Sequence, residues 1–398
     1  MTQTSGDAVI AGFAAATWIG SGVAPLFEAF ERGLETGAVR RTSGQGEPTA
    51  LAFPPLDRDV SHLLRKARSH DQLSVQLLAA IEADLSQALA GLGTAEREQT
   101  SVALGNTSGS LDAYLRFYAK GTREGPRSVN PADFPATLPN QQAVAVSDAF
   151  ALTGPNTTFG SGVAAGLDAI GWAAERLALG REHHALAGGL DGAGESSLEQ
   201  LRGADCLGNG AALRPLRAGR SGTLPAPGIG VLHLERSKPG GARGLAAVRG
   251  HASACGKLAN GAGALRHRTA EVLRQALRAA GAVIGDVDAV FPSANGTRAG
   301  DALELEVLGD VFAARPGSLP VYPVKAFFGE CSTAAGPLQC IGALYAMHHG
   351  RSPGAADSPR PPTNGELWFP EHMARCECAL VYTLGTDGTA SALVLERS

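Results

Sequence analysis

The sequence is short of aromatic residues, of cysteine and of long hydrophobic runs. Only 5% of its 398 residues are aromatic, and its net charge is −4. No apolar run reaches the roughly 18 residues of a transmembrane helix, so no membrane span is expected. The N-terminus lacks a basic and then apolar leader, which predicts a cytoplasmic protein without a signal peptide. Because basic residues are not in excess, nucleic acid is not expected as a partner.

Metal-binding motifs are also scarce. The six cysteines include one close pair, Cys376 and Cys378, without a second pair to complete a zinc site. Two histidine pairs occur, His183-His184 and His348-His349, but neighbouring side chains on a regular element point in different directions. We therefore expect neither a metal ion nor another cofactor.

What the chain does contain is glycine and a large apolar fraction. It has 52 glycines and is 44% hydrophobic, which favours a closely packed α/β protein. Apolar periodicity predicts two successive series of strands and helices, which indicates a duplicated architecture of two halves, residues 1–240 and 241–398. The predicted strands are Val9–Ala16, Ser101–Leu104, His184–Gly188, Gly228–Leu234, Leu245–Val248, Val287–Phe291, Val321–Val324, Ala379–Leu384 and Ser391–Leu395. The predicted helices are Val23–Thr36, Leu73–Leu92, Ala164–Ala178, Thr269–Ala280, Ala302–Phe312 and Pro337–His348, and residues 37–60 and 351–370 are expected as irregular segments.

Four segments carry a family resemblance. They are AVIAGFAAATWIG at residues 8–20, GPNTTFGSGVAAG at 154–166, KAFFGECSTAAG at 325–336 and LGTDGT at 384–389. In this order and spacing the sequence resembles the β-ketoacyl synthases of the thiolase superfamily over nearly its whole length. The resemblance implies a thiolase-like α/β fold with duplicated αβαβα layers.

The three groups that carry the family's chemistry are all replaced. The resemblance places Val163 at the nucleophilic cysteine, and Asn295 and Glu330 at the two histidines. Valine has no lone pair to attack a thioester, asparagine does not titrate near neutral pH, and an ionised glutamate would repel a developing enolate. Lys325 of the family motif is kept, and an ion pair with Glu330 is its expected structural role.

A second loop near the expected pocket also departs from the family. Thr386 stands where the family has a gating phenylalanine, and Asp387 replaces the following glycine. The acidic residue after Asn295 comes sooner than in the family, at Asp301 or Glu304. The resemblance therefore implies a kept scaffold with an altered pocket.

Loss of one group could leave a decarboxylase, but loss of all three indicates a non-catalytic chain-length factor, or KSβ subunit. Such a subunit would pair with an active ketosynthase, work on chains held by an acyl carrier protein, and shape the tunnel of a type II polyketide synthase. The sequence leaves polyene and aromatic products open. Two alternatives remain: an acyltransferase or hydrolase that uses Ser161 or another residue, and a purely structural carrier-protein-binding homologue.

Three aromatic residues within five positions stand out in a chain with so few. Tyr114, Phe117 and Tyr118 have the spacing of one helical face. By resemblance this helix lies at a subunit interface and lines the acyl tunnel, where bulky rings could limit chain length. Ordinary interface or core packing is the alternative for these rings.

Overall fold

The computed structural model describes residues 7–34, 36, 51–64, 71–208, 213–237, 244–256, 261–349, 367–368 and 376–398. Much of the expected irregular segments 37–60 and 351–370 lies outside these ranges, as does most of the expected boundary between the two halves. Within the described ranges, no helix has the length and hydrophobicity needed to cross a bilayer.

Strands and helices alternate along the chain, as the apolar periodicity predicts. The strands are β1 (Ala8–Thr17), β2 (Gly20–Ser21), β3 (Thr100–Gly105), β4 (Asn156–Phe159), β5 (His184–Asp191), β6 (Gly228–Arg236), β7 (Ala246–Cys255), β8 (Ala289–Phe291), β9 (Leu319–Pro320), β10 (Leu367–Trp368), β11 (Cys378–Leu384) and β12 (Thr389–Arg397). The α-helices are α1 (Val23–Arg32), α3 (Ser61–Leu64), α4 (Gln72–Ala90), α5 (Thr94–Glu98), α6 (Leu111–Glu124), α7 (Gln141–Phe150), α8 (Ala165–Ala178), α9 (Glu195–Gly203), α10 (Gly261–Ala280), α11 (Arg298–Phe312), α12 (Lys325–Phe328) and α13 (Ala335–His349), with short 3₁₀ turns η1 (Pro131–Thr137), η2 (Gly162–Ala164) and η4 (Ser332–Ala334).

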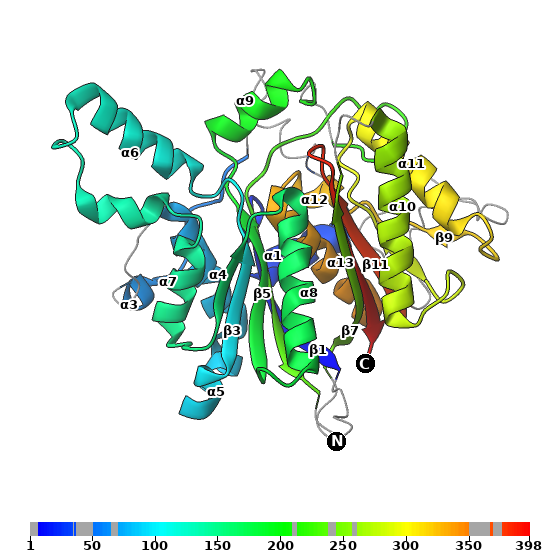
Figure 1. Cartoon of the computed structure of the whole chain (residues 1–398), viewed down its shortest axis with the longest axis horizontal. Helices are drawn as coiled ribbons and strands as arrows, with labels where there is room; N and C mark the ends of the chain where they lie inside the picture. Colours follow the sequence, from blue (N-terminus) through cyan, green and yellow to red (C-terminus); the bar gives the residue numbers. More distant parts are fainter. Residues whose placement is uncertain are drawn as a thin grey trace.

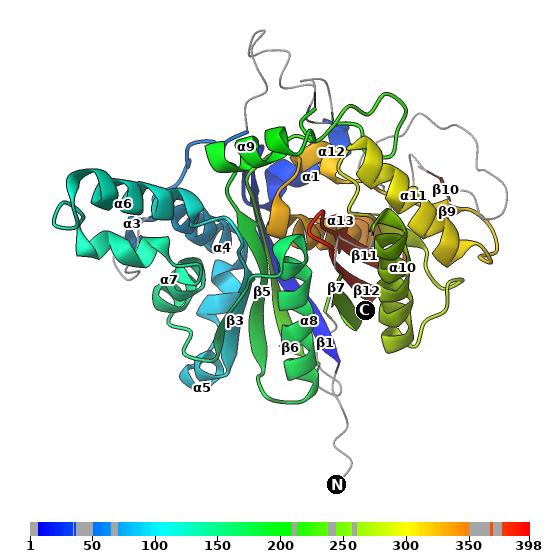
Figure 2. The same ribbon diagram turned by 45° about the horizontal axis from the view of Figure 1, so that its top comes forward.

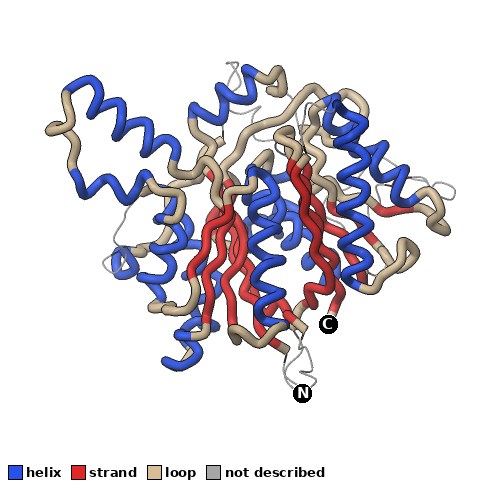
Figure 3. The backbone as a smooth tube through the Cα atoms, in the orientation of Figure 1, coloured by secondary structure: helices blue, strands red, loops and turns tan. Residues whose placement is uncertain are grey.

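One strongly twisted sheet runs through the molecule (Figures 1 and 3). Its order is β4-β3-β5-β6-β1-β7-β12-β11-β8, with β2 paired to β1. Strand β1 joins the two halves, because it pairs with β6 along its length and with β7 only through Ala8–Ile10. The expected mixed α/β fold is therefore present, with each half contributing its own set of strands.

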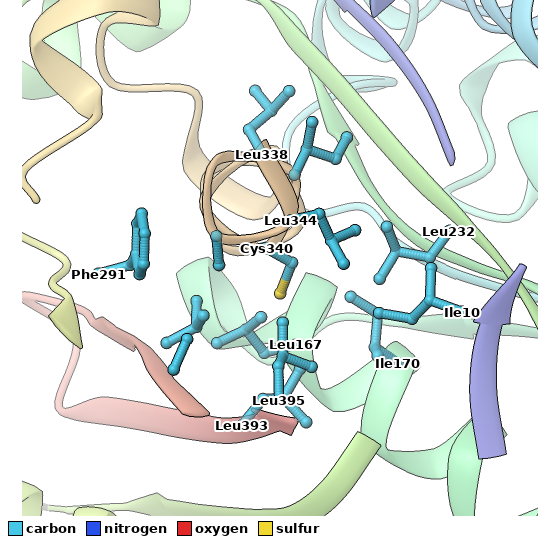
Figure 4. Packing of buried hydrophobic residues seen from close by; sticks show 14 of the residues in the cluster. Ile10, Leu167, Ile170, Leu232, Phe291, Leu338, Cys340, Leu344, Leu393 and Leu395 are labelled. Carbon is cyan, nitrogen blue, oxygen red and sulfur yellow. The ribbon is translucent and has the colours of Figure 1, made fainter. Parts of the chain in front are cut away.

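Helices cover both faces of each half, so the molecule has alternating helical and sheet layers. Helices α4 and α7 pack on the outer face of the first half, and α10 and α11 pack on the outer face of the second. Helices α8 and α13 lie between the halves, and Leu167 and Ile170 of one helix share an apolar cluster with Cys340 and Leu344 of the other (Figure 4). This apolar central layer fixes how the loops at the strand ends face each other.

The two central helices begin in the same way. A 3₁₀ turn precedes each: η2 comes before α8, and η4 before α13. Each helix then opens with Ala-Gly, at Ala165-Gly166 and Ala335-Gly336. The backbone approaches so closely here that a Cβ on Gly166 would lie 2.1 Å from the carbonyl oxygen of Thr333. These paired helix starts are the internal duplication that the sequence pattern indicated.

One predicted strand is wrong. The segment Val321–Val324 forms only an isolated bridge, from Val321 to Val290, before α12 begins. Pro320 precedes it and Pro323 lies inside it, and proline has no N–H to donate to a ladder. The strand that does form here is β9, at Leu319–Pro320, and it pairs with β10.

Helix α6 and turn η1 form a lobe that projects from the body of the molecule (Figure 2). None of the residues of α6 is buried. Five of the seven exposed large hydrophobic side chains among the described residues lie on or beside this lobe: Tyr114, Leu115, Tyr118, Phe134 and Leu138. We call these five the lobe patch.

Candidate functional site

Val163 lies at a sharp turn between a strand and a helix. Strand β4 ends at Phe159, and η2 with Val163 leads directly into α8. Gly162 has φ +60° there, and a Cβ on it would lie 2.0 Å from Asp387 Oδ2. Glycine is therefore required before Val163, because any other residue would be strained and would collide with the loop opposite. The strand-to-helix turn has the shape that presents a nucleophile in the family, and the resemblance places the inert side chain of Val163 at that position.

The residues that the resemblance places at the family's catalytic and gating positions line one cavity. Val163, Asn295, Glu330 and Thr386 all border a space of about 230 Å³. They come from η2, from the loop before α11, from the turn after α12 and from the loop between β11 and β12. The structure therefore brings Val163 together with three residues that lie more than 100 positions further along the sequence. Asp387 is not among the lining residues, since its Oδ1 accepts hydrogen bonds from the N–H and hydroxyl of Thr389.

Glu330 is fully engaged by the protein. Its Oε2 accepts a hydrogen bond from Lys325 Nζ at 2.8 Å, and its Oε1 accepts one from the Ser332 N–H at 3.1 Å. The side chain of Lys325 is 2% exposed and that of Glu330 is 12% exposed. The expected Lys325–Glu330 ion pair is thus confirmed as a buried one. A negative charge held here opposes the formation of an enolate oxygen in the cavity.

Asn295 is also held in place by its neighbours. Its Oδ1 accepts hydrogen bonds from the N–H and the hydroxyl of Thr297, at the start of α11. The buried carboxylate of Asp301 accepts the backbone N–H groups of Asn295 and Gly296, both at 3.1 Å. The early acidic residue therefore shapes the Asn295 loop, and the side-chain oxygen of Asn295 closes a local turn onto Thr297, the residue before α11.

Neither alternative nucleophile has an activating base. Ser161 donates its hydroxyl to Asp168, and the nearest histidine, His251, contacts Asp168 and Ser391 instead. Burial alone would raise the pKa of Asp168, but hydrogen bonds from His251 and Ser161 outweigh it and lower that pKa, which makes the carboxylate a poor base. Burial raises the pKa of the Cys331 thiol well above its ordinary value, so that side chain stays protonated.

Two buried acids lie near the cavity: Glu304, one of the two early acidic residues noted in the sequence, and Asp191, which the sequence analysis does not name. Asp191 ends β5, accepts the hydroxyl of Ser108 at 2.8 Å, and has a pKa that burial raises to about 6. Glu304 accepts the hydroxyl of Tyr382 at 2.7 Å, and burial raises its pKa to about 8. In the sequence, the sole indication for Asp191 is its position at the end of a buried strand. The burial of Glu304 depends on tertiary packing and has no local sequence pattern.

A second cavity of about 320 Å³ adjoins the first. It lies between the starts of α10 and α11, with Leu265 and Leu303 in its wall and Glu304 beside them. Asn295 and the loop Leu384-Gly385-Thr386 line both cavities and so separate them. Two of the positions at which the resemblance indicates a replacement, Asn295 and Thr386, therefore lie in the wall between the two cavities.

The three aromatic residues lie elsewhere. Tyr114 and Tyr118 on α6 are 44% and 45% exposed, and the ring centroid of Phe117 is 6.0 Å from that of Phe134 on η1. None of the three is among the residues that line the cavity at Val163. In this chain they belong to the projecting lobe, so any part in a tunnel depends on a partner.

The chain belongs to the β-ketoacyl synthase family. Residues 54–239 match the β-ketoacyl synthase N-terminal domain, and residues 245–357 match the C-terminal domain. Together these matches cover most of the sequence, and the ten-stranded mixed sheet is the fold expected of them.

Particular members of the family resemble the chain to different extents. It is 27% identical to 3-oxoacyl-[acyl-carrier-protein] synthase 2 of Rhizobium meliloti, over 84% of this chain and 82% of the relative. It is 29% identical to actinorhodin polyketide β-ketoacyl synthase 2 of Streptomyces coelicolor, over 95% of both chains. A solved structure of the ishigamide ketosynthase/chain length factor superposes with a TM-score of 0.79 at 21% identity, over 99% of this chain and 100% of the other. That last likeness supports the fold alone.

Proposed function

We propose that this chain is a chain-length factor, a non-catalytic subunit that pairs with an active ketosynthase in a type II polyketide synthase. The observation that carries the proposal is the chemistry of the cavity. Val163 cannot be acylated, Glu330 is held in an ion pair with Lys325, and the side-chain oxygen of Asn295 is taken up by Thr297. The cavity has no nucleophile at Val163, and burial raises the pKa values of the two thiols in its wall, Cys206 and Cys331, which suits a subunit whose partner performs the reaction.

Two surface features support pairing with another subunit. Strand β4 is at the end of the sheet and pairs, within the described part of the chain, only with β3. Exposed edge strands are sites where a sheet can be extended by another chain. The lobe patch adds large hydrophobic side chains beyond this edge, and contiguous exposed hydrophobic surface is typical of protein–protein interfaces.

The proposed partners follow from the relatives. One relative is named as a synthase acting on acyl-carrier-protein substrates, and one similar structure is a ketosynthase with its chain length factor. We infer that this chain meets an active ketosynthase and that the complex works on chains held by an acyl carrier protein. Tyr114, Phe117 and Tyr118 would then face the partner and help close the tunnel that limits chain length.

Co-expression with a ketosynthase that has its cysteine and both histidines tests the pairing. We expect a 1:1 complex on sizing, because the lobe patch is buried on association. The double variant Tyr114→Ser/Tyr118→Ser should lose the partner while remaining folded, since both side chains are exposed. Leu179→Ser is the matched control, because Leu179 is 53% exposed at the far end of α8. If the wild type, the double variant and Leu179→Ser all recovered the ketosynthase equally, the proposed interface would be refuted.

The repurposed acyltransferase or hydrolase receives less support. Ser161 lacks a histidine partner, and Cys331 is a buried thiol. A chain that carried such an activity would form an acyl adduct when incubated alone with an acyl-carrier thioester.

A further inference from the structure

Two histidines and a glutamate gather at the end of the sheet remote from the cavity. His184 begins β5, and His233 and Glu235 lie near the end of β6. In the antiparallel ladder His184 pairs with Glu235, and Leu186 pairs with His233. Because side chains alternate along a strand, His184, His233 and Glu235 all project from one face.

Their donor atoms are close enough to share an ion. Glu235 Oε1 lies 3.7 Å from His184 Nδ1 and 3.8 Å from His233 Nε2. One ligand atom from each residue can be chosen so that all three lie within 4.8 Å of one another. Ligand atoms around a tetrahedral zinc ion are about 3.4 Å apart, given metal–ligand distances near 2.1 Å. Small side-chain rotations are enough to reach that geometry.

The buried, unpartnered ring of His233 is a second observation that indicates a bound ion. Its side chain is 2% exposed, and neither of its ring nitrogens has a hydrogen-bond partner. A buried polar group left without a partner is costly, and such groups in native proteins often face a water or an ion that completes them. Its Nε2 lies on the side of Glu235, so an ion bound between the two would supply that partner.

We propose that His184, His233 and Glu235 bind one divalent transition-metal ion, with Zn²⁺ as the best fit. Two imidazoles and a carboxylate are ligands that zinc prefers, and they leave a fourth position for water. Glu235 is 40% exposed, so the ion has a path from solvent, while both histidines are buried beneath it. The proposal is independent of the chain-length-factor function.

The surrounding groups suit a cation. Glu96 Oε1 on α5 lies 4.0 Å from His184 Nε2, the nitrogen that a metal on Nδ1 would leave free. A carboxylate behind a metal-bound histidine orients the ring and strengthens its donor atom. Burial, together with the neighbouring His184, lowers the pKa of His233 to about 4, so its imidazole is neutral and able to coordinate at physiological pH.

The site would be structural. His184 and Asp191 stand at opposite ends of β5, and seven strand steps put the ion about 23 Å from the cavity. An ion here would tie β5 to β6 and draw α5 towards them. No local sequence pattern indicates this site, because the partners of His184 lie across the ladder on β6, and the adjacent His183 is not part of the cluster.

Metal binding by the untagged full-length protein tests the proposal, with Co²⁺ as the spectroscopic probe and Zn²⁺ as competitor. We expect one Co²⁺ per chain with the visible absorption of a low-symmetry site, displaced by Zn²⁺. His184→Gln and Glu235→Gln should each weaken binding about tenfold or more. The matched control is His183→Gln, which removes a neighbouring histidine outside the cluster and should bind as the wild type does. Zn²⁺ should also raise the melting temperature of the wild type and the control only.

Two results would overturn the proposal. One is no saturable Co²⁺ binding by the wild type. The other is equal binding by Glu235→Gln and the wild type, since the exposed Glu235 can be replaced without disturbing the core. If His184→Gln fails to fold, the comparison of Co²⁺ binding between Glu235→Gln and the wild type decides whether the site exists.

Discussion

Glu330, in the wall of the cavity, forms a buried ion pair with Lys325, so the charge on Glu330 is balanced by the lysine and by local hydrogen bonds. Both oxygens of Glu330 are used, one by Lys325 Nζ and one by the backbone of Ser332. Removing two charges from water is expensive unless the geometry is good, and here it is. The pair therefore accounts for the retention of the family lysine in a cavity without the family chemistry.

Glu330→Ala should destabilise the protein by about 3–5 kcal/mol, because it leaves the Lys325 ammonium buried without its partner. The control is Lys325→Met/Glu330→Ala, which removes both charges and should recover most of that loss. Urea unfolding of the three proteins measures the free energies. If the single variant lost less than about 1 kcal/mol, as an exposed pair would, the pair would not be the buried one described.

Glu304 predicts a pH dependence of stability. Its folded pKa is about 8, raised by burial above the ordinary value of 4.5, so the folded protein keeps a proton that the unfolded chain has released. Between these values the free energy of unfolding falls as pH rises, by up to about 1.4 kcal/mol per pH unit for this group. The stabilisation is complete below pH 4.5 and is lost by the time the pH has passed 8.

Glu304→Gln isolates this contribution, because Asp84 and Asp191, with pKa values of about 6, add slopes of the same sign in both proteins. Urea unfolding from pH 5 to pH 8 should give the variant a flatter profile than the wild type. Parallel profiles would show that Glu304 is ionised in the folded state over this range.

At the scale of elements, the lobe formed by α6 and η1 is where the proposed subunit would influence the product. Phe117 packs edge to face against Tyr118 and lies 6.0 Å from Phe134, so it supports the lobe and is less exposed than the tyrosines. In the proposed complex, the ring of Phe117 would therefore form part of the tunnel wall, and the two exposed tyrosines would contact the partner.

Phe117→Ala, co-expressed with the active ketosynthase, should lengthen the polyketide, because a smaller side chain leaves more room for the acyl chain. Mass spectrometry of the released product measures the change. Tyr114→Phe, which keeps the ring and removes only a hydroxyl, is the control and should leave the length unchanged. Unchanged length with Phe117→Ala at normal yield would remove the tunnel role.

The elements that the sequence predicted well are those with strong local periodicity. Val9–Ala16 and Leu73–Leu92 match β1 and α4 within two residues at each end, because buried strands and long amphipathic helices carry their pattern in the chain itself. Val321–Val324 has the apolar composition of a strand, but it forms only one bridge because Pro323 cannot donate a hydrogen bond to a ladder.

The site was predictable in part. Val163, Asn295 and Glu330 were grouped through the family motifs, since nothing local connects positions so far apart. The cluster of His184 and His233 depends on the register between β5 and β6, which no local pattern reports. The same holds for the burial of Asp191 and Glu304, which is a property of the packed core.

At the scale of the whole molecule, a duplicated scaffold has been kept while its chemistry has been replaced at three separate points. Helices α8 and α13 still start with matched turns against each other, and the cavity between the loops is still open. A pairing subunit needs these features, whereas a condensing enzyme of this family would also need the nucleophile. This contrast is the basis for the chain-length-factor proposal.

Intact-protein mass spectrometry of the reconstituted complex tests that central claim most directly. The complex of this chain with an active ketosynthase is incubated with acyl- and malonyl-carrier protein. We predict that the acyl group is found on the ketosynthase alone, that the mass of this chain is unchanged, and that polyketide forms only when both subunits are present. An acyl adduct on this chain, or product formed by this chain without the ketosynthase, would contradict the account.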